Sequence, residues 1–118
     1  MKKAISFSYN WNKKLECDAY TTLRLSNRLK EGDKVEVFLN QHFMHYARVI
    51  EKKKLSIQQI RASKAICYLD TGKSPEETIN LLTTMYKNSD PPVDWSSQPV
   101  YWYLFAKCAK EDQLELQL

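Results

Sequence analysis

Hydrophobic and polar residues alternate over several short runs in the first half of the chain, which is typical of half-buried β-strands. Residues 34–39 alternate polar and apolar residues, and in residues 20–25 β-favouring residues surround a single arginine, Arg24. Asn40 and Gln41 are predicted to form the turn of a hairpin, because asparagine tolerates the left-handed backbone conformation that such turns need. The pattern therefore predicts four strands in this half, over residues 4–8, 20–25, 34–39 and 43–50.

The apolar residues take a helical spacing in the second half, which predicts two helices. Ser56 opens a capping-box pattern ahead of an apolar stripe over residues 57–69, and Gly72 is placed to end this helix in the left-handed conformation. Ser74 is an N-cap residue followed by a proline and two glutamates. Because acidic residues favour the first turn of a helix, these residues predict a second helix over residues 75–87.

The remaining stretches complete a prediction of one α+β domain. Residues 10–15 fit either a short helix or an open loop, and residues 88–97 are predicted to form an irregular loop. Residues 100–110 are apolar on both faces, which predicts a central strand buried on both sides. A chain of 118 residues is long enough for one such core. We expect a single domain over residues 1–110, followed by a tail, 111–118, whose state the pattern does not assign.

Composition narrows the class of protein. Hydrophobic residues make up 43% and charged residues 27% of the chain, as in ordinary soluble proteins. No apolar run approaches the roughly 20 residues of a membrane span, so no membrane partner is expected. The three cysteines form no close pair, and His42 and His45 are predicted to lie on opposite faces of a strand. We therefore expect a reduced, cytoplasmic protein with no metal site and no cofactor.

Positive charge is concentrated in the first half of the chain. Residues 1–64 contain 14 Lys and Arg against 6 Asp and Glu, whereas residues 65–118 contain 4 against 8. This asymmetry favours a polyanionic partner such as RNA, and chance clustering on a solvated surface explains it equally well. Trp11 stands beside Lys13 and Lys14. Such a ring suits stacking on a base, although it also suits covering the end of a barrel.

One stretch resembles the signature of the ASCH domains of the PUA-like superfamily, G-x-K-x-x-E-x-R followed by a Gly-Asp turn and a valine-rich strand. In this register the signature glycine falls on Cys17, the lysine on Ala19, the glutamate on Thr22 and the arginine on Arg24, which alone keeps its type. Thr22 is similar to one branch with Lys-x-x-Thr-x-Arg, which includes amidohydrolases acting on acylated nucleosides. The resemblance implies a small mixed β-barrel with flanking helices.

The resemblance also implies a cleft beside the barrel, in which the signature strand faces Asp70. Arg24 would bind an anion there, because its rigid fork of donors suits a phosphate or a carboxylate. An alternative is that Arg24 holds the fold together by pairing with an internal carboxylate such as Asp70. The candidate ligand-binding residues are Trp11, Tyr20, Thr21, Thr22, Arg24, Arg28 and Asp70.

Three functions follow as hypotheses: a module that binds RNA or a nucleotide-like anionic ligand, a hydrolase related to the nucleoside amidohydrolases, and a domain kept for protein interaction. In the hydrolase, Thr22 would position or attack and Asp70 would act as the base. A threonine hydroxyl is a poor nucleophile unless a base or a lysine activates it. Ala19 has no such group, and only a lysine from elsewhere, such as Lys13 or Lys14, would replace it. We therefore expect catalysis to be weak or absent.

Overall fold

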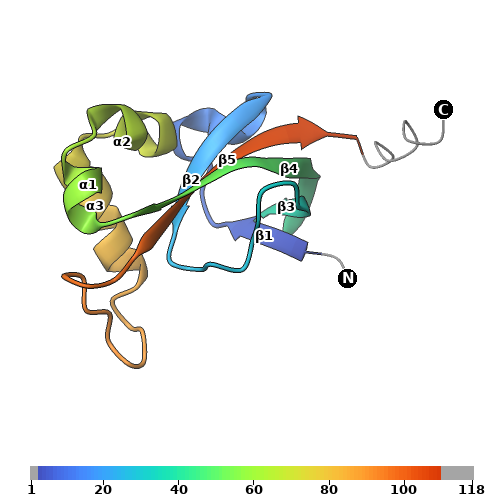
Figure 1. Cartoon of the computed structure of the whole chain (residues 1–118). Helices are drawn as coiled ribbons and strands as arrows, with labels where there is room; N and C mark the ends of the chain where they lie inside the picture. The colour runs from blue at the N-terminus through green and yellow to red at the C-terminus, as the bar shows by residue number, and fades with distance from the viewer. Residues whose placement is uncertain (1–2, 110–118) are drawn as a thin grey trace.

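Five strands form one mixed sheet in the order β1-β3-β4-β5-β2 in the computed structural model, which describes residues 3–109 (Figure 1). The strands are β1 (Lys3–Phe7), β2 (Ala19–Arg24), β3 (Lys34–Leu39), β4 (His42–Leu55) and β5 (Val100–Cys108). β1 runs parallel to β3, and the other neighbours are antiparallel. All five predicted strands are therefore confirmed, most of them to within a residue or two at their ends.

β4 is the exception, because it continues well past its predicted end at residue 50. Its last residues pair with β5, with Lys53 opposite Trp102 and Leu55 opposite Val100. The lysine run at residues 52–54 thus lies inside the strand rather than after it. Pairing with β5 satisfies the backbone hydrogen bonds of this charged stretch. The lysine ammonium groups lie over aromatic rings, as Lys53 Nζ does at 5.3 Å from the centre of the Trp102 ring.

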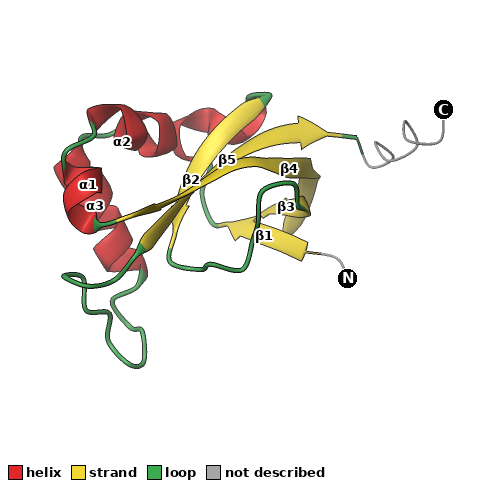
Figure 2. Ribbon diagram, viewed as in Figure 1, coloured by secondary structure: helices red, strands yellow, loops and turns green. Residues whose placement is uncertain are grey.

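Helices gather beside one end of the sheet (Figure 2). They are the 3-10 helix η1 (Trp11–Glu16) and the α-helices α1 (Ile57–Arg61), α2 (Lys64–Thr71) and α3 (Pro75–Met85). The single helix predicted over residues 57–69 is wrong, since the chain breaks at Ala62 and Ser63. The Ser63 side chain accepts a hydrogen bond from the backbone N–H of Ile66 and so begins α2 as a separate helix. Gly72 ends α2 with a φ of 76°, as predicted.

β5 supplies apolar side chains to two cores on opposite faces of the sheet. Tyr103 and Phe105 belong to the first, which covers one face with side chains that include residues of β1 to β4. Val100 and Trp102 belong to the second, which packs the sheet against α1, α2 and α3. The prediction of a central strand buried on both faces is confirmed, and the second core is what fixes α2 and α3 beside β2.

β1 and β2 are the two edges of this sheet, and no ladder joins them within residues 3–109. Two arginine side chains instead bridge the seam, the gap between these two edge strands. Arg24 donates from Nη2 to the Ser6 carbonyl at 2.8 Å, and Arg28 donates to the Ala4 carbonyl. A mixed sheet with flanking helices is therefore confirmed, whereas the closed barrel is not.

Among the described residues, no helix is long and apolar enough to cross a membrane. The second predicted helix is confirmed as α3, which ends at Met85, two residues before its predicted end. The irregular connection to β5 is also confirmed, and it covers residues 86–99 rather than the predicted 88–97. The predicted tail, residues 111–118, lies outside the described part of the chain.

Candidate functional site

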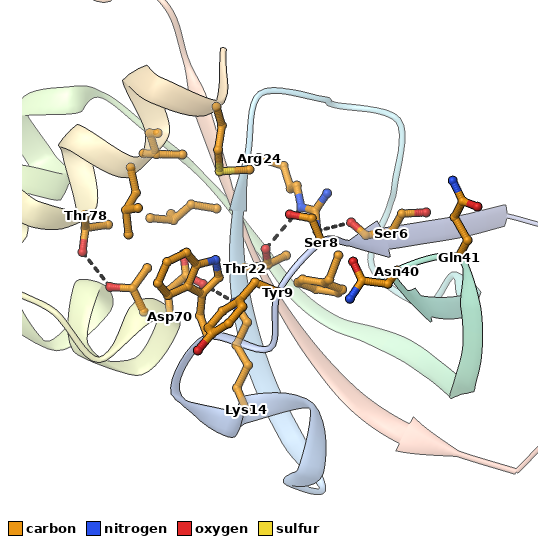
Figure 3. Close-up of a pocket in the computed structure, with 17 residues that line it drawn as sticks. Ser6, Ser8, Tyr9, Lys14, Thr22, Arg24, Asn40, Gln41, Asp70 and Thr78 are labelled. Atoms are coloured by element: carbon orange, nitrogen blue, oxygen red, sulfur yellow. Dashed lines mark hydrogen bonds and ion pairs between the residues drawn. The ribbon is translucent and has the colours of Figure 1, made fainter. Parts of the chain in front are cut away.

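A cleft with a volume of about 370 Å³ lies where η1, β2, α2 and α3 meet the edge strand β1 (Figure 3). This volume falls in the range of small-molecule pockets. Apolar side chains of α3 line one end, and polar residues of β1 and of the β3–β4 turn line the other. Its charged side chains are Lys14, Arg24 and Asp70.

Lys14 and Asp70 form a buried ion pair in this cleft. The Lys14 ammonium binds Asp70 Oδ1, and the two residues are only 3% and 6% exposed. Burial lowers the pKa of Lys14, the Asp70 carboxylate opposes that effect, and the charge of Arg24 adds to it. Because its pKa is lowered overall, Lys14 reaches the neutral amine form more readily than an ordinary lysine.

A strained turn presents Lys14 to Asp70. Asn12 and Lys13 both have left-handed backbones, with φ of 57° and 52°, which is uncommon for residues other than glycine. The Asn12 side chain donates to the Tyr68 carbonyl at 3.2 Å, one turn before Gly72 on α2. The turn that carries Lys14 is therefore bound to the same turn of helix that carries Asp70.

We expect Gly72→Ala to destabilise the protein more than Gly32→Ala. Both glycines have left-handed φ angles, +76° and +92°, so an added Cβ costs each roughly 1–2 kcal/mol. At Gly72 the Cβ would also lie 3.1 Å from the Asn12 side chain, whereas at Gly32 it meets nothing within 4 Å. Urea denaturation of the two variants measures the difference. Equal losses of unfolding free energy would show that the Asn12 side chain moves aside without cost and does not hold the turn.

Thr22 and Arg24 point into the cleft from alternate positions of β2. Thr22 is 4% exposed, and its Oγ1 accepts a hydrogen bond from Arg24 Nε at 3.2 Å. The Arg24 guanidinium lies over the Phe7 ring at 4.6 Å. Burial lowers the pKa of Arg24, which nonetheless stays charged as arginines do. A fixed positive charge therefore lies beside a threonine hydroxyl whose proton remains available.

Asp70 makes its ion pair with Lys14 rather than with Arg24, so the alternative in which Arg24 pairs with Asp70 is wrong. Arg24 instead donates to Thr22 and to the Ser6 carbonyl. Arg24 thus has two roles. It links the edge strands β1 and β2, and it places a positive charge in the cleft.

Of the predicted site residues, Trp11, Thr22, Arg24 and Asp70 line the cleft, and Tyr20, Thr21 and Arg28 do not. Tyr20 is buried in the first core, where its hydroxyl bonds His45 Nε2 at 2.8 Å and burial raises its pKa. Thr21 faces the opposite side of β2, because side chains alternate along a strand. Its buried Oγ1 has no hydrogen-bond partner among the described residues. The Arg28 side chain reaches the Ala4 carbonyl, away from the cleft.

Sequence reasoning named Lys14 only as one of two possible replacements, and it missed Tyr9, Asn40 and Gln41, all of which line the cleft. Nothing in the local sequence separates Lys14 from Lys13. The left-handed turn decides which of the two enters the cleft. Tyr9 lies two residues after the end of β1, and an aromatic residue just beyond a predicted strand was the available signal.

No group of three or more His, Cys, Asp or Glu side chains in the described part of the chain is placed to hold a metal ion. Comparison of the sequence and the structure with protein-family models, curated proteins and solved structures gave no match.

Proposed function

We propose that this protein is a hydrolase that cleaves an acyl bond, an amide or an ester, of a small nucleoside-like substrate. The observation that carries the proposal is the buried Lys14–Asp70 pair in the same open cleft as the Thr22 hydroxyl. Ala19 offers no amine, which led to the expectation of weak catalysis. Lys14 supplies an amine from a different element and so supports a catalytic role.

In the proposed reaction, the neutral amine of Lys14 accepts the proton of the Thr22 hydroxyl as Oγ1 attacks the carbonyl carbon of the substrate. The charge that develops on the carbonyl oxygen is offset by the Arg24 guanidinium. Collapse breaks the acyl bond, and the leaving amine or alcohol takes the proton from Lys14. Water then attacks the Thr22 ester by the same route, which releases the carboxylic acid and restores the hydroxyl.

Asp70 acts on Lys14 in this scheme rather than as the base that the sequence suggested. Its carboxylate fixes the position of Nζ and stabilises the ammonium that forms when Lys14 takes a proton. A buried ion pair contributes little to stability compared with apolar side chains of similar volume. Its presence in the same cleft as the Thr22 hydroxyl therefore supports a chemical rather than a structural reason for the pair.

The resemblance to ASCH domains supports the same class of reaction. β2 lines the cleft, and Asp70 faces it from α2, as that resemblance implies. We propose that the sheet corresponds to the PUA-like barrel, with Arg24 and Arg28 bridging its seam. We also propose a cytoplasmic location, because the three cysteines are free.

A second candidate is binding of a nucleotide-like anion without chemistry, and Arg24 favours it. The Nη1 group of Arg24 has no hydrogen-bond partner within residues 3–109, and the guanidinium lines the cleft. Extended RNA is less favoured, because several cations of the basic half already bind the protein's own carbonyls. Lys52, for example, donates to the carbonyls of Asn27 and Leu29. Turnover separates this candidate from the hydrolase.

The proposal is tested by incubating the protein with a panel of N-acylated and O-acylated nucleosides and measuring released acid against pH. We expect kcat/KM to rise with pH and to level off below the ordinary lysine pKa of 10.5. The value of kcat/KM rises with pH because the reacting form of Lys14 is the neutral amine. It levels off below 10.5 because burial lowers the pKa of Lys14. Absence of turnover across the panel would remove the hydrolase and leave the binding candidate.

A further inference from the structure

The end of the cleft farthest from α3 is polar, and no part of the proposed reaction uses it. Asn40 and Gln41 line it from the β3–β4 turn, and Ser6 and Ser8 line it from the end of β1. In Figure 3 Asn40 and Gln41 lie at the opposite side of the cleft from Thr78 and Asp70. The side-chain amides of Asn40 and Gln41 have no hydrogen-bond partner in the described part of the chain.

The backbone holds these amides in place. The Asn40 N–H donates to the Phe7 carbonyl at 2.9 Å, which ties the turn to the end of β1. Both turn residues have left-handed backbones, with φ of 50° at Asn40 and 70° at Gln41. Such turns strongly favour glycine at the second position, where glutamine is strained. The chain therefore keeps an amide side chain at a position where glycine would make the turn more stable.

An aromatic pair borders the same cleft. Tyr9 is 59% exposed, and its ring packs against Trp11 with centroids 4.6 Å apart. In Figure 3 Tyr9 lies across the middle of the cleft, between Asp70 and Asn40. An exposed ring beside unpaired amides offers a planar ligand both a face to stack on and an edge to bond.

We infer that this end of the cleft is a subsite for a planar heterocycle with an amide-like edge, such as a pyrimidine base. The ring stacks on Tyr9, and the Asn40 and Gln41 side chains bond its edge, because a carboxamide carries a donor and an acceptor side by side. The inference rests on the proposed function for the location of the acyl bond, near Thr22. The inference adds that the base is the part of the substrate that the cleft recognises.

The turn itself provides the test, through Gln41→Gly and Gln41→Asn. Both substitutions relax the left-handed position, because glycine and asparagine tolerate it better than glutamine, and both should raise the melting temperature. Only the asparagine keeps an amide. Affinity for cytidine and uridine should fall about tenfold in Gln41→Gly, the loss expected for one or two hydrogen bonds, and less in Gln41→Asn.

Calorimetric titrations with cytidine, uridine, adenosine and their 5′-monophosphates measure these affinities, with ribose 5-phosphate as the probe that lacks a base. Ribose 5-phosphate should bind the unmodified protein and both variants equally. Equal nucleoside affinity in all three proteins would overturn the subsite, as would failure of every nucleoside and nucleotide to bind. The hydrolase is judged separately, by turnover of the acylated panel. Binding that depends on Gln41 without turnover would keep the subsite and remove the reaction.

Discussion

Thr22→Val should lower turnover of an acylated nucleoside by roughly 10²–10⁴-fold, because the variant removes the proton that Lys14 takes in the first step. Valine matches threonine in shape and favours a strand, so β2 should keep its place. Thr22 is 4% exposed, and the added methyl group therefore stays out of water. The measurement is kcat on the best substrate of the panel, with circular dichroism as a check of the fold.

Thr22→Ser is the matched control for this prediction. Serine keeps the hydroxyl and loses only a methyl group, so turnover should stay within about tenfold of the unmodified protein. An acyl group should also accumulate on Thr22 when the second step is slow, and mass spectrometry would detect it. Turnover that survives Thr22→Val would assign the attack to water activated directly by Lys14, and would end the nucleophilic role of Thr22.

Asp70→Asn should cost roughly 3–5 kcal/mol of unfolding free energy at neutral pH, because it leaves a buried ammonium without its counter-charge. The loss should shrink as pH rises. Removing the carboxylate takes away an effect that raises the pKa of Lys14, so the pKa falls further. The unfolded chain then binds more protons than the folded chain, and stability increases with pH up to the ordinary lysine value. Urea denaturation at several pH values measures both effects.

A double substitution separates the stability of the pair from its chemistry. Lys14→Met together with Asp70→Leu removes both charges and fills the space with apolar side chains, which should recover most of the lost stability. Turnover should be lost in this double variant, since the amine of Lys14 is gone. If the double variant is as unstable as Asp70→Asn, the cost comes from packing around α2 rather than from an unpaired charge.

Local chemistry explains why the sequence predicted many of the elements. Ser56, Gly72 and Ser74 mark helix ends, and each acts through hydrogen bonds within a few residues. The β3–β4 turn depends on the left-handed tolerance of Asn40, again a local property. The alternation in β3 sets which side chains are buried, because a strand has a period of two.

The candidate site was predictable only in part. Thr22 and Arg24 share one face of β2, and their common side follows from that same period. Tyr20 shares the period too, yet it lies in the first core, because packing against Phe7 and His45 rather than alternation decides its surroundings.

Tertiary structure decided the rest. Lys14 and Asp70 are separated by 56 positions in the chain, and no local rule pairs them. Their contact depends on the left-handed turn at Asn12 and Lys13, and that turn is held by a bond to α2. Likewise β4 runs through its lysines because β5 lies beside it. The sequence alone therefore determined the helix ends and turns, which depend on neighbours along the chain. The tertiary fold determined the Lys14–Asp70 pair, since a buried ammonium is stable only where a distant carboxylate reaches it.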